Sequence, residues 1–131
     1  MENSFRSGFV NEENARQFLL NPMNWLFACI QDKQIIGFAK GYELNRLDKR
    51  SNMMYIHEVG VLPQYHRQGI AFEIFAAIKT MCKINGICKF FLMTQKANIA
   101  ACRLYEKVGG KKMVDVDNGD VDIGYYFNEF D

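Results

Sequence analysis

The chain has 131 residues, close to the commonest size of a single domain, so we expect one domain over residues 1–131. It is 49% hydrophobic with a formal net charge of +1, and this balance excludes a nucleic-acid-binding protein that works through a basic excess. No apolar run approaches membrane-spanning length, and the polar start is unlike a signal peptide, so we expect a cytoplasmic protein without membrane partners.

The first part of the chain predicts a short helix and a pair of strands. Asn11 is a good helix N-cap, and Asn21-Pro22 ends the helical pattern. Apolar and other residues alternate before and after the turn at Asp32-Lys33, as in a β-hairpin. The expected elements are a helix over residues 11–20, strands over 24–31 and 34–44, and a polar loop over 45–52.

The middle of the chain predicts a strand, a glycine turn and a long helix. Residues 53–62 are rich in β-branched and large apolar side chains, which favours a strand. After the turn, apolar residues recur at helical spacing to about residue 85. They form one stripe of Ile70, Ile74, Ile78 and Met81, with Ala71, Phe75 and Cys82 beside it.

The last part predicts a strand, a helix and a hairpin. Residues 87–94 are continuously apolar, so we expect a strand buried on both faces. Asn98 caps a helix that stops at Gly109-Gly110, and Asn118-Gly119 would turn between strands over 111–116 and 121–130. The cysteines form no Cys-x-x-Cys pair, so we expect four reduced thiols and no metal site: Cys29, Cys82, Cys88 and Cys102.

The glycine turn between the middle strand and the long helix predicts an anion site. A helix start presents unpaired backbone N–H groups at the positive end of the helix dipole, and this arrangement binds phosphate. The chain lacks the Gly-x-x-x-x-Gly-Lys-Ser/Thr loop of nucleotide triphosphatases and the three-glycine dinucleotide motif. A phosphorylated cofactor of another kind is therefore expected, unless the turn merely starts a helix.

Two motifs resemble the GNAT superfamily of N-acetyltransferases. The turn, residues 66–71, resembles that family's diphosphate loop, Gln/Arg-x-x-Gly-x-Gly/Ala, with His66 where Gln or Arg is usual. Residues 98–109 resemble the helix Asn-x-x-Ala-x-x-Leu-Tyr-x-Lys-x-Gly that follows the family's fifth strand. The resemblance implies acetyl-CoA as donor, no metal, and these cofactor-binding residues: Val59, Gly60, Val61, His66, Arg67, Gln68, Gly69, Ile70, Ala71, Asn98 and Ala101.

The same resemblance implies the fold. It predicts an α+β, three-layer architecture with a mixed, mostly antiparallel, twisted sheet of about six strands and helices on both faces. The family opens with a further strand and helix, for which the first ten residues are too few, so this end looks shortened. Residues 5–9 would pair as a stub, or a partner chain would cover the edge. An uncovered apolar edge invites association, which makes a homodimer a prediction.

Acetyl transfer to an amine needs a base, an oxyanion donor and an acid for the leaving thiolate. Glu58 is the predicted base, because a carboxylate in an apolar strand is costly unless partnered or functional. Strand alternation would place Glu58 with Ile56 and the fallback base His57 with Val59. The family implies Tyr105 as the acid and the Val59 N–H, beside a bulge, as the oxyanion donor. The alternatives without a catalytic role are that Glu58 is a solvated edge residue and that Tyr105 is an aromatic residue of the core.

The amine acceptor is the part of the expected reaction that the sequence constrains least. Residues 41–44 and 55–61 are similar to the GNAT-type aminoglycoside 3-N-acetyltransferases. The last residues carry six acidic side chains and no basic one after Lys112, which would attract a polycationic amine or merely keep a hairpin soluble. We therefore expect a small, aminoglycoside-like primary amine. A silent acyl-CoA sensor and a protein or peptide Nα- or Lys-acetyltransferase are the alternatives. The acidic residues are Asp115, Asp117, Asp120, Asp122, Glu129 and Asp131.

Overall fold

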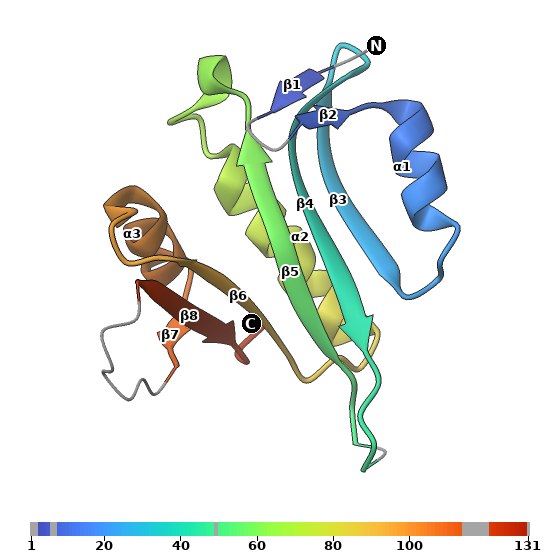
Figure 1. Cartoon of the computed structure of the whole chain (residues 1–131), viewed down its shortest axis with the longest axis vertical. Coiled ribbons are helices and arrows are strands. Elements are labelled where there is room, and N and C mark those ends of the chain that lie inside the picture. The colour runs from blue at the N-terminus through green and yellow to red at the C-terminus, as the bar shows by residue number, and fades with distance from the viewer. Residues whose placement is uncertain (1–2, 6–7, 49, 114–120, 131) are drawn as a thin grey trace.

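A six-stranded mixed sheet forms the centre of the computed structural model, which describes residues 3–5, 8–48, 50–113 and 121–130 (Figure 1). The β5–β6 pair is parallel and the other neighbours are antiparallel. This confirms the expected fold class. In spatial order the strands are β3 (Asn24–Gln31), β4 (Gln34–Leu44), β5 (Met53–Val61), β6 (Lys89–Gln95), β8 (Asp122–Phe127) and β7 (Lys111–Lys112).

Helices lie on both faces of the sheet, as expected. On one face, α2 (Ile70–Ile84) and α3 (Ile99–Lys107) cover the main core. The ring of Phe75 from α2 lies 5.5 Å from that of Phe127, centroid to centroid, and 5.8 Å from that of Tyr105 on α3. On the other face, α1 (Glu12–Leu19) packs the ring of Phe18 edge-on against Tyr42 of β4, at 5.7 Å.

Local sequence signals account for several element boundaries. The Oδ1 of Asn11 accepts a hydrogen bond from the N–H of Asn14 and so caps α1. Asp32 and Lys33 both take positive φ in the tight turn between β3 and β4. The four cysteines are free thiols, and burial raises the pKa of the Cys82 thiol to about 12, with smaller contributions from Glu43 and Cys88.

Two details differ from the expectations, and a third lies partly outside the described residues. The β6 strand is not buried on both faces: Phe90 and Leu92 face the core, but Met93 on the other face is 49% exposed. Among the described helices, α2 and α3 pack on the core face and α1 packs against β3 and β4. Among the described residues β7 spans Lys111–Lys112, and residues 114–116 of the expected strand lie outside them, as does the expected turn at Asn118-Gly119. Near the N-terminus, β1 (Asn3–Phe5) and β2 (Gly8–Val10) pair with each other rather than with the large sheet.

The pairing between β5 and β6 is short, and this positions the site. Met53–Tyr55 of β5 pair with Lys89–Phe91 of β6, and beyond these residues the two strands diverge (Figure 1). Residues 56–61 of β5 therefore pair with β4 on one side only. The start of α2 and the start of α3 lie near this end of β5.

Candidate functional site

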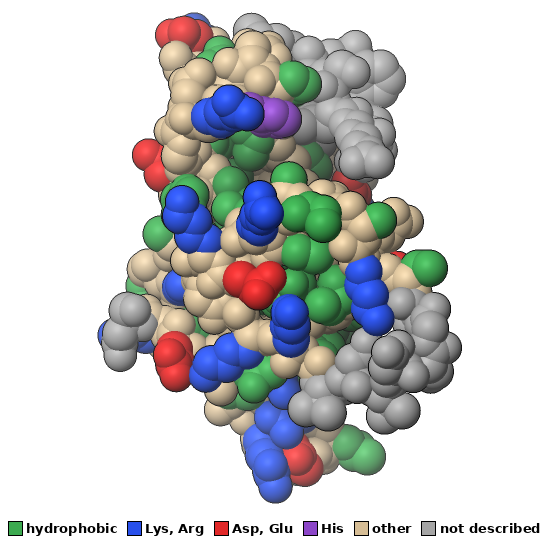
Figure 2. All heavy atoms as spheres, turned by 90° about the vertical axis from the view of Figure 1, so that its left-hand side faces the viewer, with side chains coloured by type: hydrophobic (Ala, Val, Ile, Leu, Met, Phe, Trp, Pro, Cys, Tyr) green, Lys and Arg blue, Asp and Glu red, His purple; other side chains and the backbone are tan. Residues whose placement is uncertain are grey.

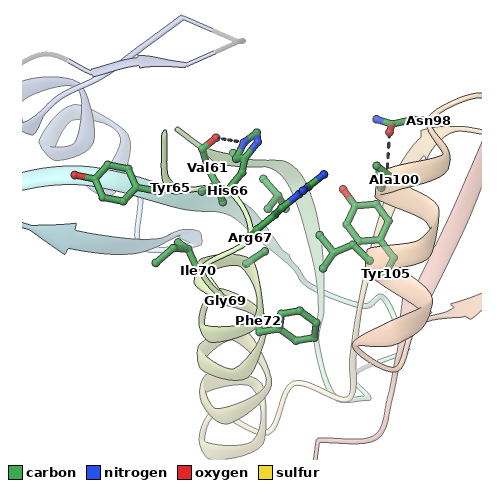
Figure 3. Close-up of a pocket in the computed structure, with 15 residues that line it drawn as sticks. Val61, Tyr65, His66, Arg67, Gly69, Ile70, Phe72, Asn98, Ala100 and Tyr105 are labelled. Atoms are coloured by element: carbon green, nitrogen blue, oxygen red, sulfur yellow. Dashed lines mark hydrogen bonds between the residues drawn. The ribbon is translucent and has the colours of Figure 1, made fainter. Parts of the chain in front are cut away.

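A cavity of about 470 Å³ lies where the end of β5, the start of α2 and the start of α3 meet (Figure 3). The two motifs singled out in the sequence come from different parts of the chain, and the fold brings them to the same cavity. Ten of the eleven expected cofactor-binding residues line it, together with Tyr105: Val59, Gly60, Val61, His66, Arg67, Gly69, Ile70, Ala71, Asn98 and Ala101. Gln68 and Glu58 do not line it.

The start of α2 is suited to an anion. Gly69 takes the N-cap position in the left-handed region, with φ of 78°, and no side chain caps the helix. The first-turn N–H groups, which have no partner within the helix, thus face outward at its positive end. Arg67, also at positive φ (63°), extends its guanidinium into the space between α2 and α3 (Figure 3). A diphosphate fits this donor set.

Two other side chains of this loop are used to hold its shape. The His66 ring donates from Nε2 to the carbonyl oxygen of Val61 at 2.9 Å, so it ties the loop to the end of β5. Gln68 donates from Nε2 to the carbonyl oxygen of Gln64 at 3.2 Å. The Arg67 guanidinium and the backbone N–H groups are therefore the groups of this loop that place positive charge at the cavity.

The first turns of α3 form the opposite wall. The Oδ1 of Asn98 accepts a hydrogen bond from the N–H of Ala101 at 3.1 Å and caps the helix. The hydroxyl of Tyr105 points into the cavity (Figure 3). Burial, and to a smaller extent the charge of Cys102, raises the pKa of Tyr105 above its ordinary value. Its hydroxyl therefore holds its proton at neutral pH and is available as a donor.

A β-bulge on β5 changes the expected placement of Glu58. Lys40 pairs with Glu58 and Gly41 with Ile56, so His57 is the extra residue. Ile56 and Val59 both belong to the core under α2, whereas the His57 ring lies near Tyr42 and Tyr55 on the opposite face. The expectation that Glu58 shares a face with Ile56 is therefore wrong, because strand alternation fails at the bulge.

On that opposite face Glu58 forms an ion pair. Its Oε1 lies 2.8 Å from the Nζ of Lys40, and each side chain is about one quarter exposed. Burial alone would lower the pKa of Lys40, but the hydrogen bonds and charges of Glu58 and, to a smaller extent, Tyr42 together outweigh it, and the pKa is raised. The Lys40 ammonium is therefore stabilised beside Glu58, which directly precedes the cavity-lining Val59.

The sequence matches the model of the acetyltransferase (GNAT) family over residues 2–110, which is most of the chain. The chain belongs to the acetyltransferase (GNAT) family. It is thus an N-acetyltransferase with acetyl-CoA as its acyl donor, and the phosphate chemistry of this donor fits the uncapped start of α2. No curated protein matches the sequence.

Solved structures of GNAT-like proteins share the fold. An aminoglycoside acetyltransferase from an uncultured soil metagenomic sample superposes with a TM-score of 0.73 at 19% identity, covering 85% of this chain and 73% of that one. The PaiA N-acetyltransferase from Thermoplasma acidophilum, in complex with coenzyme A, superposes with a TM-score of 0.72 at 17% identity. The match covers 89% of this chain and 68% of that one. The ribosomal-protein-S18-alanine N-acetyltransferase from Escherichia coli superposes with a TM-score of 0.69 at 19% identity. The match covers 93% of this chain and 79% of that one. At these identities the similarity shows the fold alone.

Four residues that line the cavity of this acetyltransferase were missing from the sequence-based set: Tyr65, Phe72, Ala100 and Leu104. Leu104 and Ala100 share a helix face with Ala101 and Tyr105, so helical spacing could have found them. Phe72 is an apolar residue that stays 43% exposed in the first turn of α2, which no pattern predicts. Among the residues that the structure describes, no cluster of His, Cys, Asp and Glu could hold a metal ion. None of the helices in that part of the chain is both long and apolar enough to span a membrane.

Gly37 of β4 lets the start of α2 approach the sheet. A Cβ at this position would lie 2.7 Å from the Cγ2 of Ile70 and 3.1 Å from the Cδ1 of Ile74. We expect Gly37→Ala to lower the free energy of unfolding by about 1–3 kcal/mol and to weaken CoA binding, because the first turn of α2 must move. Chemical denaturation and calorimetry measure the two effects.

The matched variant for this prediction is Gly37→Ala combined with Ile70→Ala. It removes the methyl group that the new Cβ would meet, so the two stability losses should add up to more than the loss in the double variant. Simple additivity of the two losses would show that this contact does not set the position of α2.

Proposed function

We propose that this N-acetyltransferase acetylates a primary amine of a small, polycationic acceptor by direct attack in a ternary complex, with Glu58 as base and Tyr105 as acid. One observation carries the proposal. The cavity joins an uncapped helix start, suited to the diphosphate, to the hydroxyl of Tyr105 and to the β5 backbone beside Glu58. The donor and the two proton-transfer groups would therefore meet at the bulge.

Each residue has a proposed role in binding the donor or in proton transfer. Bound acetyl-CoA supplies the acetyl thioester that the amine nitrogen attacks. The first-turn N–H groups of α2 and Arg67 hold the diphosphate, and the main chain of Val59 and Val61 lies along the pantetheine arm. Glu58 takes a proton from the ammonium, directly or through water, and the hydroxyl of Tyr105 gives a proton to the leaving sulfur. The N–H of Val59, beside the bulge, is the proposed oxyanion donor.

The acceptor would approach from the face opposite α2. The His57 ring lies 6.0 Å from that of Tyr42 and 5.7 Å from that of Tyr55, next to the ion pair of Glu58. Tyrosine faces attract cations, so this group suits an amine with more than one ammonium. A related structure of the soil aminoglycoside acetyltransferase contains sisomicin, a precedent for such an acceptor on this fold.

The acidic C-terminal residues add less support than the sequence indicated. Four of the six lie outside the described residues, and of the other two, Glu129 pairs with Lys111 at 3.1 Å. A net attraction for a polycation near β8 thus stays a prediction. The aromatic group beside Glu58 is the stronger argument for the acceptor class.

The test is incubation with acetyl-CoA and a panel of aminoglycosides, polyamines and amino-terminal peptides, read by release of free thiol. We expect aminoglycosides or polyamines to raise thiol release well above hydrolysis, with the product confirmed by mass spectrometry. Turnover of peptides alone would replace the proposed acceptor class with a protein acetyltransferase. Binding of CoA without turnover of any amine would leave a silent sensor.

Lys40 provides a test of the base that does not remove the base itself. Lys40→Gln removes a cation 2.8 Å from Glu58, so the pKa of Glu58 should rise relative to the wild type. The acid limb of the kcat/KM profile should then move to higher pH, because protonated Glu58 cannot accept a proton. An acid limb that stays in place would show that Glu58 does not control it. Lys33→Gln, in the β3–β4 turn, serves as the control for loss of one positive charge.

A further inference from the structure

The two edges of the six-stranded sheet differ in how well they are protected from another strand. At one edge, the described part of β7 is Lys111–Lys112, which pairs with β8 on its inner side. A short edge strand that carries lysines discourages pairing with a second chain. Lys and Arg side chains are spread over this side of the molecule (Figure 2). This edge is therefore poorly suited to an added strand.

The opposite edge, β3, lacks these protections. The strand has eight residues, none of which is charged or a proline. Its register with β4 shifts at Cys29 and Ile30, but the extra residue is Ile36 of β4, so β3 itself is not bulged. No described strand pairs with its outer side, since β1 and β2 pair with each other (Figure 1). An edge of this kind is a template for another strand.

The second half of β3 is the accessible part of this edge. The helix α1 is held against the first residue of the strand, because the Nδ2 of Asn24 donates to the carbonyl oxygen of Phe18 at 2.9 Å. Toward the end of β3, Ala28 and Ile30 are exposed, and the exposed fraction of Ile30 is 63%. A large apolar side chain thus lies at the surface beside the unpaired backbone.

A groove of about 320 Å³ lies between this half of β3 and α2. Of the described residues that line it, Glu73 alone is charged, and its Oε2 lies 3.9 Å from the Sγ of Cys29. A strand added to β3 would place alternate side chains over this groove. Backbone pairing and the burial of apolar surface would then act together. The groove is lined by Phe27, Ala28, Cys29, Glu73, Ile74 and Ala77.

We infer that the β3 edge joins two copies of this chain by antiparallel pairing of β3 with β3, which makes one continuous sheet. Two identical antiparallel strands are related by a two-fold axis, the commonest symmetry of protein dimers. Because β3 is uncharged, its two copies bring no like charges opposite each other. The pairing would cover Ile30 and give the homodimer expected from the sequence a specific interface. The donor cavity begins at β5, two strands away, and is not part of this interface.

Sedimentation velocity of the full chain, between about 1 and 100 μM, tests the interface. The wild type should sediment as a dimer in the upper part of this range. Ile30→Lys should raise the dissociation constant at least about tenfold, because a lysine at a paired edge opposes the added strand. Ile84→Lys, at the end of α2, is the matched control: its isoleucine is 70% exposed, and the variant should dimerise like the wild type.

Hydrogen exchange of the wild type locates the interface without a substitution. Amides of residues 24–31 should exchange more slowly at high than at low protein concentration, and those of β7 should not change. A wild type that stays monomeric throughout would overturn the inference. So would a dimer that survives Ile30→Lys, or one whose formation leaves exchange in β3 unchanged. Binding of CoA by Ile30→Lys shows that the variant is folded, and neither result depends on which amine is acetylated.

Discussion

Replacing Glu58 by Gln should lower kcat by about 10²–10⁴ while leaving the KM for acetyl-CoA nearly unchanged. Glu58 lies outside the donor cavity, so the variant keeps the groups that would hold the cofactor. It loses the carboxylate that we propose as the proton acceptor, and the acid limb of the pH profile should disappear with it. Steady-state kinetics with the best amine of the panel, between pH 6 and 10, measure both effects.

This variant leaves the Lys40 ammonium, about one quarter exposed, without its carboxylate partner, so its stability must be followed as well. Lys40→Met combined with Glu58→Gln removes both charges and should be as inactive as the single Glu58 variant, but more stable. Glu12→Gln, on the exposed face of α1, is the matched control and should be fully active. A Glu58→Gln enzyme with normal kcat would show that water or His57 removes the proton.

Tyr105→Phe should lower kcat about 10²-fold, again with little change in the KM for acetyl-CoA. The ring keeps its packing against Phe75 and Tyr125, and only the hydroxyl that points into the cavity is lost. Without it, the leaving sulfur takes its proton from solvent. Donors with a more acidic thiol need this proton less, so the loss should be smaller for an activated thioester.

The pH dependence gives this assignment a second readout. The pKa of Tyr105 is raised above its ordinary value near 10 by burial, so its proton is kept to higher pH than in solution. Any fall in kcat caused by its ionisation should therefore occur above pH 10, and Tyr105→Phe should remove that fall. Tyr126→Phe, on β8 and outside the cavity, is the control. Equal kcat for Tyr105→Phe and the wild type would leave Tyr105 as a packing residue.

Much of the donor site could be predicted from the sequence because its determinants are local. Gly69 at positive φ and the Asn98 cap are features of single turns, and each motif indicates where its own backbone N–H groups point. That the two motifs meet at one cavity followed from the resemblance, since neither contains information about the other.

The features that the sequence did not predict depend on contacts with neighbouring strands and helices. The bulge at His57 moves Glu58 to the opposite face, and a bulge is set by pairing with β4 rather than by the β5 sequence alone. The hydrogen bond from the His66 ring to Val61 was likewise not foreseen, although His66 lines the cavity as expected. Met93 looked buried in the apolar β6 sequence, but it is half exposed, since the described helices pack on the core face or against β3 and β4. Such facts require the assembled sheet.

The short β5–β6 pairing has a consequence for the stability of the domain. Residues 56–61 of β5 pair on one side only, so part of the backbone hydrogen bonding of a continuous sheet is left for another molecule to supply. Bound donor would act there as an additional structural element and would raise the melting temperature as its concentration rises. The resistance of this enzyme to heat and proteolysis would thereby follow the supply of acetyl-CoA.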